Sequence, residues 1–285
     1  MTGHVTQTKF SDTSLDQRSM VWDLSLGELL ERAGANWGDR EALVIGDDRL
    51  TYSQLLVVAR ATARRLVRVG VCSGSHIAIL ARNCPEWVIS YFAITMAGAV
   101  AVPVNPRFSA REIAYVLRKS RCSMVLGADG TRSLIDTLPG EDGDHVRATV
   151  DIYEFSTGGD RFAGLPEPDK ATPLPFVSPD ETAVIMFTSG STAFPKGCIL
   201  KHLGLVRNAV LHDRRLQLGQ EDRWFGPTPF FHASGCVWGI LSTAVVGAAL
   251  ISCDHFDAMR AMELLEAEAC TYQHGIDTMF VRQLE

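Results

Sequence analysis

Two periods of apolar residues alternate along the first half of the chain, one typical of helices and one typical of strands. Helices are predicted after Ser25, over Ser53–Val69 and after Ser109, and the first and last begin with a capping box, a serine followed three residues later by glutamate. Short apolar runs typical of buried strands follow or separate them: His76–Leu80, Ala99–Val104 and Ser123–Leu126. Helices that alternate with buried strands indicate an α/β fold with a mainly parallel sheet.

Turn-forming and capping residues refine this pattern. Glu41–Ile45 and Leu50–Tyr52 flank a Gly-Asp-Asp turn and are predicted to form a hairpin. Asn83 is predicted to cap the next helix, which has Pro85 in its first turn.

Two stretches, residues 87–106 and 225–253, contain no Asp, Glu, Lys or Arg. Each is as long as the roughly 20 residues that cross a bilayer. Gly98 and Gly247 interrupt them, however, and in each case an apolar run typical of a strand follows the glycine. A glycine between an apolar helix and such a run is typical of a buried helix–turn–strand unit, so we expect no integral membrane segment.

The same pattern predicts the domain organisation. Residues 1–23 are a polar tail, 24–138 a first α/β lobe, 139–181 a connection rich in proline and glycine, and 182–285 a second α/β lobe. The helix–Gly–strand units of the two lobes are alike, so the expected fold is two similar lobes of mainly parallel sheet flanked by helices. The second lobe is interpreted as truncated, because the chain stops within a predicted helix at 277–285.

Composition excludes several classes of protein. The chain of 285 residues has 27 Lys and Arg against 33 Asp and Glu, a net charge of −6, and no run of basic residues, so a nucleic-acid partner is not expected. Its seven cysteines include no C-x-x-C pair and are interpreted as reduced, buried thiols, not as a metal site. With no secretory signal in the first twenty residues, a cytoplasmic location is expected.

One segment carries candidate chemistry. A predicted strand at 182–187 runs into hydroxyl residues and a glycine and then into Pro-Lys-Gly; the residues expected to contact a polyphosphate are Thr188, Ser189, Gly190, Ser191, Thr192 and Lys196. Gly190 would let backbone N–H groups approach phosphate oxygens, the hydroxyls would donate hydrogen bonds, and Lys196 would add a positive charge. The spacing does not fit a Walker A loop. From composition alone, an ordinary Ser/Thr/Gly surface loop is the alternative.

Thr188–Gly197 resembles the T-S-G-[ST]-T-G-x-P-K-G signature of the adenylate-forming (AMP-binding) superfamily, with Ala193 in place of a glycine. Met96–Pro106 resembles the family's A-G-A-x-x-x-P-x-[ND]-P block, and Thr228–Gly235 resembles its P-x-F-H-x-x-G block. The three blocks occur in the family's order, and Asn105 together with Arg107 makes the chain more similar to acyl-CoA synthetases than to peptide-synthetase domains.

The resemblance implies the N-terminal portion of an acyl-CoA synthetase. Such a ligase activates a carboxylic acid, here a fatty or other organic acid, as acyl-AMP with ATP and Mg²⁺, and then transfers the acyl group to coenzyme A. By the same resemblance, Lys196 and the loop hydroxyls contact the ATP phosphates and catalysis involves Lys196 and His232, which would lie near the substrate carboxylate. A lone histidine beside an aromatic residue is otherwise more often structural. No metal ligand is assigned.

Two other interpretations remain open. The family's Mg²⁺, ribose and catalytic-lysine motifs have no counterpart in these residues, so the chain is expected to be inactive alone. The second interpretation is that it is a catalytically incomplete protein of this fold that serves as a binding or interaction module. A nucleotide-binding α/β protein that matches by chance is the third interpretation. The unpaired edge expected at a truncated sheet would favour self-association, so a homo-oligomer is one expected state.

Lys196→Ala is expected to lower kcat/KM for ATP in the complete ligase on the order of 100-fold, because the positive charge that stabilises the leaving pyrophosphate is lost. Binding of the acid should change less. ATP–pyrophosphate exchange kinetics measure both, and an unchanged kcat/KM for ATP would contradict the role assigned to Lys196.

Overall fold

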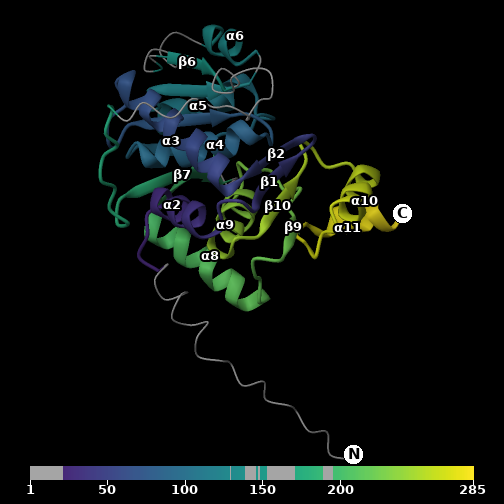
Figure 1. The fold of residues 1–285 in the computed structure, drawn as a ribbon. Helices are drawn as coiled ribbons and strands as arrows, with labels where there is room; N and C mark the ends of the chain where they lie inside the picture. The colour runs from purple at the N-terminus through teal and green to yellow at the C-terminus, as the bar shows by residue number, and fades with distance from the viewer. Residues whose placement is uncertain (1–21, 129, 139–145, 147, 153–170, 189–194) are drawn as a thin grey trace, which may run out of the picture.

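The computed structural model of the protein describes residue 22 onward, except residues 129, 139–145, 147, 153–170 and 189–194 (Figure 1). Its described strands form two sheets, one of six strands and one of five. Most strand pairs in both sheets are parallel, as the alternation of helices and strands predicts. The expected fold class, mainly parallel sheets flanked by helices, is therefore confirmed.

The six-stranded sheet has the order β6-β5-β3-β4-β7-β8. Its strands are β3 (His76–Leu80), β4 (Val100–Pro103), β5 (Met124–Gly127), β6 (Ala148–Asp151), β7 (Thr182–Thr188) and β8 (Lys196–Lys201). Only the β7–β8 pair is antiparallel among these. The carboxyl ends of β3, β4, β5 and β7 therefore lie at one edge of the sheet.

The five-stranded sheet has the order β11-β9-β10-β1-β2. Its strands are β1 (Glu41–Ile45), β2 (Asp48–Thr51), β9 (Arg223–Phe225), β10 (Ala249–Ser252) and β11 (Tyr272–Gln273). The β1–β2 hairpin is antiparallel, as predicted, and the other pairs are parallel.

The boundary between the two sheets differs from the predicted lobes 24–138 and 182–285. The β1–β2 hairpin pairs with β10, in the register Val44↔Ile251, so part of the first segment belongs to the second sheet. Conversely, β7 pairs with β4 through Ala101↔Val184, which places the start of the second segment in the first sheet. Hydrophobic periodicity identifies a strand but not its neighbour, and for this reason the division by sequence and the division by sheet do not coincide.

The helices divide among three layers (Figure 1). Between the sheets pack α2 (Leu26–Trp37), α3 (Tyr52–Arg68), α4 (Pro85–Met96), α8 (His202–Leu216), a π-helix (Ser234–Leu241) and α9 (Ser242–Val246). On the outer face of the first sheet lie α5 (Ala110–Lys119) and α6 (Thr131–Asp136), and on that of the second lies α10 (Ala258–Ala267), followed by α11 (Asp277–Leu284). Both predicted capping boxes are present, at Ser25 and Ser109.

The helix α4 explains the first long uncharged stretch. All twelve of its residues are buried, and they contact side chains of both sheets in one continuous core. The second uncharged stretch forms the π-helix, α9 and β10, which are buried in the same way. In the part of the chain that the structure describes, no helix is both long and apolar enough to cross a membrane.

A buried histidine joins α8 to α2. Leu26 N–H donates to His202 Nδ1 at 3.1 Å, and His202 is 1% exposed. Burial lowers the pKa of His202 to about 4, so the ring is neutral and its Nδ1 can accept this bond at the first turn of α2.

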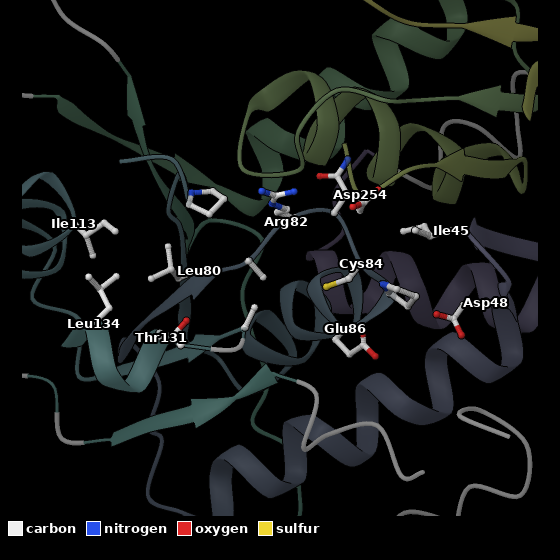
Figure 2. Close-up of a pocket in the computed structure, with 16 residues that line it drawn as sticks. Ile45, Asp48, Leu80, Arg82, Cys84, Glu86, Ile113, Thr131, Leu134 and Asp254 are labelled. Carbon is white, nitrogen blue, oxygen red and sulfur yellow. The ribbon is translucent and has the colours of Figure 1, made fainter. Parts of the chain in front are cut away.

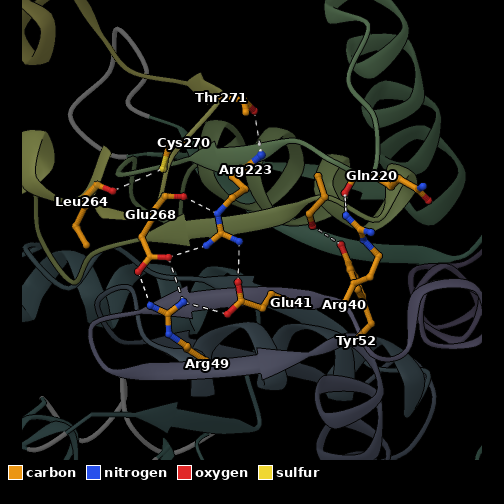
Figure 3. A network of polar contacts seen from close by, with 11 residues as sticks. Arg40, Glu41, Arg49, Tyr52, Gln220, Arg223, Leu264, Glu268, Cys270 and Thr271 are labelled. Carbon is orange, nitrogen blue, oxygen red and sulfur yellow. Dashed lines mark hydrogen bonds and ion pairs between the residues drawn. The ribbon is translucent and has the colours of Figure 1, made fainter. Parts of the chain in front are cut away.

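Four charged side chains connect strands and a helix end of the second sheet (Figure 3). Arg223 on β9 donates to Glu41 at 2.7 Å and to Glu268 at 2.6 Å, and Arg49 on β2 donates to the same two carboxylates. Burial would raise the pKa of Glu41, but the guanidinium groups of Arg223 and Arg49 outweigh it, so this pKa lies below its ordinary value. The pKa of Glu268 is also lowered, mainly by its hydrogen bond from Arg49. The network therefore fixes β9 against β1, β2 and the residue that follows α10.

Arg223→Met should lower the free energy of unfolding by about 1–3 kcal/mol, because Glu41 and Glu268 would lose a shared, half-buried cation. The matched control is Arg260→Met, since Arg260 pairs at 3.0 Å with Glu263 where both side chains are more than half exposed. That control should cost less than about 0.5 kcal/mol. Urea unfolding at neutral pH measures both, and equal losses would contradict the role of the network.

Candidate functional site

The carboxyl ends of both sheets border a pocket of about 680 Å³. Its lining comes from the loops that follow β3, β4, β9 and β10, and from the first turns of α11. Four of these loops contribute charged or titratable groups: Arg82, Arg107, His232 and Asp254. We call this cavity the histidine pocket.

A second cavity, of about 700 Å³, lies on the other side of Arg82, Asn83, Pro106 and Asp254, which line both (Figure 2). Figure 2 shows Ile113 and Leu134 on one side of it, with Ile45 and Asp48 from the β1–β2 hairpin on the other. The loops after β3 and β5 form its base. β3 is followed by α4, which packs between the sheets, and its neighbour β5 is followed by α6 on the outer face. Open α/β sheets commonly bind ligands where two adjacent strands connect to opposite faces in this way.

His232 lies at the wall of the histidine pocket. The residue is exposed to the cavity, and its ring lies against Phe231 with 4.5 Å between ring centroids. Desolvation by the surrounding protein lowers the pKa of His232 below its ordinary value, which favours the neutral imidazole near pH 7. A neutral ring can donate one hydrogen bond and accept another.

The charge around the pocket is mainly positive. Burial would raise the pKa of Asp254, but hydrogen bonding to His255 and the charge of Arg82 lower it, so the carboxylate is ionised. Asp254 and His255 approach to 2.8 Å. Among the described residues, no ion pair engages the guanidinium of Arg107. Sequence reasoning did not assign Arg82, Arg107 or Asp254, although each follows a strand at its carboxyl end.

The predicted phosphate loop connects the strands of a hairpin. Thr188 is the last residue of β7 and Lys196 the first of β8, and the two form the final pair of the ladder. Both are exposed, and Lys196 has no ion pair within the described parts of the chain. Ser189, Gly190, Ser191 and Thr192 lie outside the described residues. The hairpin opens at the same sheet edge as the histidine pocket, but Thr188 and Lys196 do not line that pocket.

These residues differ in how well they fit the implied ligands. An exposed lysine that pairs with no carboxylate among the described residues, next to a threonine hydroxyl, fits the phosphates of a nucleotide. For a metal ion, the residues that the structure describes contain no group of three or more His, Cys, Asp or Glu side chains that could hold it. The part of the chain described here thus presents donors for phosphate and no metal cluster.

Asn83 corrects one prediction. It does not cap α4; the residue at the N-cap is Cys84, which makes no side-chain capping bond. The Asn83 amide instead turns toward the second sheet, where it bonds to the loop that precedes His232. No local pattern distinguishes these two uses of an asparagine before a helix, because the second depends on residues about 145 positions later.

A tight turn sets the position of His232. His232 N–H donates to Pro229 O at 3.0 Å, and the carbonyl of His232 accepts from Gly235 and Cys236 as the π-helix begins. A Cβ atom at Gly235 would lie 2.3 Å from the Pro229 carbonyl oxygen, closer than backbone atoms tolerate. Glycine is therefore required there by the close approach of two backbone segments.

Two cavities outside the carboxyl ends of parallel strands are the arrangement in which α/β proteins commonly bind ligands. The chain belongs to the AMP-binding enzyme family, whose pattern it matches over residues 30–285. It is 33% identical to the protein YngI of Bacillus subtilis (strain 168), over 91% of this chain and 52% of that one. It is 29% identical to the human mitochondrial medium-chain acyl-CoA ligase ACSF2, over 90% of this chain and 47% of that protein. The chain thus spans about half the length of these curated relatives.

Solved structures agree with the fold. The N-terminal domain of FACL13 from Mycobacterium tuberculosis superposes with a TM-score of 0.79 at 25% identity, covering 91% of this chain and 65% of that one. The o-succinylbenzoate coenzyme A synthetase MenE from Bacillus subtilis, solved in complex with AMP, superposes with a TM-score of 0.76 at 23% identity, over 92% of this chain and 64% of that one. The second likeness shows the fold alone.

Gly235→Ala should destabilise the protein by about 2 kcal/mol or more, because its methyl group would force Pro229 and the turn before His232 apart. Gly239→Ala, in the same π-helix, is the matched control, since its Cβ would make ordinary contacts of 3.6 Å with Leu250. Thermal unfolding should show a large loss for the first variant and little change or a gain for the second. Equal behaviour would contradict the tight approach at Gly235.

Proposed function

We propose that the chain is the N-terminal portion of an AMP-forming acid–thiol ligase, which activates a carboxylic acid and transfers it to coenzyme A. A carboxylate oxygen attacks the α-phosphorus of ATP, the bond to the β-phosphate oxygen breaks, and acyl-AMP and pyrophosphate form. The thiol sulfur of coenzyme A then attacks the acyl carbonyl and loses its proton, and AMP leaves. Membership of the AMP-binding family is the observation that carries the proposal, and His232 in the histidine pocket and Lys196 on the β7–β8 hairpin are the residues that support it.

The chain's own residues supply two parts of this chemistry. Lys196, with Thr188 beside it, would bind the phosphates and stabilise the negative charge that develops on the leaving pyrophosphate. His232, neutral near pH 7, would donate a hydrogen bond to the acid in the histidine pocket without adding a charge that holds the carboxylate too tightly. Mg²⁺ would enter with the nucleotide and neutralise phosphate charge when bound.

The two cavities suit a reaction in two steps. They share a wall of residues after β3 and β4, including Arg82 and Pro106, so ligands in both would meet at one place. We assign the acid to the histidine pocket, because His232 and the apolar side chains of Phe231 and Met279 line it. A fatty or other organic acid fits this lining.

ATP–pyrophosphate exchange tests the proposal, measured on the chain and on the longer ligase sequence that contains it, with a panel of fatty and aromatic acids. Acid-dependent exchange is expected in the longer protein and should fall on the order of 100-fold in His232→Ala. Lys119→Ala, at the carboxyl end of α5, is a control that should leave exchange unchanged. Nucleotide binding without exchange in the longer protein would instead favour a binding module.

A further inference from the structure

Asn83 makes a polar connection between the two sheets beside the histidine pocket. It follows β3 of the first sheet by three residues, and 4% of its surface is exposed. Its Nδ2 donates to the carbonyl of Thr228 at 3.1 Å and to Ser252 Oγ at 3.3 Å, and its Oδ1 accepts from Phe230 N–H at 2.8 Å. All three partners belong to the second sheet or its loops, so one buried amide spans the junction.

These bonds hold the loop that leads to His232 at two backbone groups, the carbonyl of Thr228 and the N–H of Phe230. Thr228 offers only its carbonyl here and Phe230 only its N–H, so the group between them must both donate and accept. An asparagine amide does this, whereas aspartate lacks the donor and leucine lacks both. Ser252 completes the set, because its hydroxyl donates to Gly226 O at 2.7 Å, at the start of the same loop.

Apolar packing from the same segment fixes the loop in a second way. The ring of Phe230 lies against Trp87, on the first turn of α4, with 5.6 Å between ring centroids. Both side chains are fully buried. Residues 83–87 therefore hold the Phe230 backbone through Asn83 and its side chain through Trp87, two residues before His232.

We propose that Asn83 is a positioning residue that sets where His232 stands in the histidine pocket. The rigid turn from Pro229 to Gly235 transmits the position of Phe230 to His232, since Pro229 O accepts from the His232 N–H. Catalytic groups lose efficiency when they move by about an ångström, so a loop held at Thr228 and Phe230 places the imidazole for the acid. The catalytic part of this inference rests on the proposed ligase function, and the structural part does not.

Hydrogen exchange of one amide tests the structural part directly. In the unsubstituted protein the Phe230 amide should exchange slowly, because its acceptor is the buried Asn83 side chain; exchange at the rate of an open loop would overturn the proposal. Asn83→Ala should speed this exchange about tenfold or more. Asn83→Asp keeps the accepting oxygen and should retain the protection of Phe230, and loss of protection there would contradict the assignment.

The titration of His232 gives a readout that general destabilisation does not move. Because partial burial lowers the pKa of His232, release of the loop in Asn83→Ala should raise that pKa toward its ordinary value of 6.5, as followed by NMR. The charged and titratable groups that line the same pocket are Arg82, Arg107, Asp254, His255 and Arg282. They are unchanged in this variant, so a shift reports the movement of the ring.

Thr95→Val is the matched control. Thr95 is also buried, on α4, and among the described residues it donates only to carbonyls of its own helix, at 3.1 Å to Tyr91 and 2.9 Å to Phe92. It should cost stability without changing either the Phe230 exchange, relative to global unfolding, or the pKa of His232. If Asn83→Ala matches Thr95→Val in both readouts, the proposal is wrong.

Pyrophosphate exchange in the longer ligase tests the catalytic part. Asn83→Ala should lower kcat about tenfold, with a smaller change in KM for ATP, while Thr95→Val keeps the native kcat. An unchanged kcat in Asn83→Ala would overturn the positioning role. If the unsubstituted ligase shows no exchange, the proposed function fails, and the amide exchange and the pKa of His232 still decide whether Asn83 holds the loop.

Discussion

The burial of α4 between two sheets is the constraint on which the rest of the structure depends. A helix with apolar residues around its whole circumference, here with Glu86 in the first turn as its one acidic residue, is stable in water only if protein surrounds it. Here the first sheet packs on one side, and α2, α3 and the second sheet complete the enclosure. The two sheets consequently share one core. The β1–β2 hairpin joins the five-stranded sheet, whose other strands come from the second half of the chain, and the β7–β8 hairpin joins the six-stranded sheet, whose other strands all precede it in the chain.

That shared core brings the carboxyl ends of two sheets to one place and creates polar groups there that water does not reach. Buried polar groups need partners, and at this junction the partners come from the opposite sheet. Asn83, which follows β3 of the first sheet, bonds across to Thr228 and Phe230 of the loop after β9 in the second. These bonds set the relative position of the sheets more narrowly than apolar packing does.

The candidate functional residues stand on two different sheets. The phosphate-binding candidates stand on a hairpin of the first sheet, at Thr188 and Lys196, whereas His232 stands on a turn of the second. Their separation in the fold suits a reaction in which a phosphate leaves at one place and an acyl group is held at another. Their relative position depends on the junction between the sheets, so residues of that junction contribute to the geometry of the site.

The sequence by itself determined the elements and the family. Periodicity placed nearly every helix and strand of the first half, the capping boxes at Ser25 and Ser109 marked helix starts, and the signature at Thr188–Gly197 named the class of enzyme. Such signals are local, because a cap or a phosphate-binding loop depends on residues a few positions apart. Strand β8, which begins at Lys196 within the signature, was not predicted, and the helix predicted before Gly247 begins as a π-helix that no local signal indicates.

Only the tertiary structure decided which strands are neighbours and what Asn83 does. Strand pairing depends on which apolar faces can be buried together, and this is a property of the whole chain and not of any window within it. Asn83 has the sequence context of a helix cap, yet its amide bonds to residues about 150 positions away because the packing of α4 brings them within reach. The burial of apolar faces around α4 therefore decides both which strands belong to which sheet and which residues the Asn83 amide reaches.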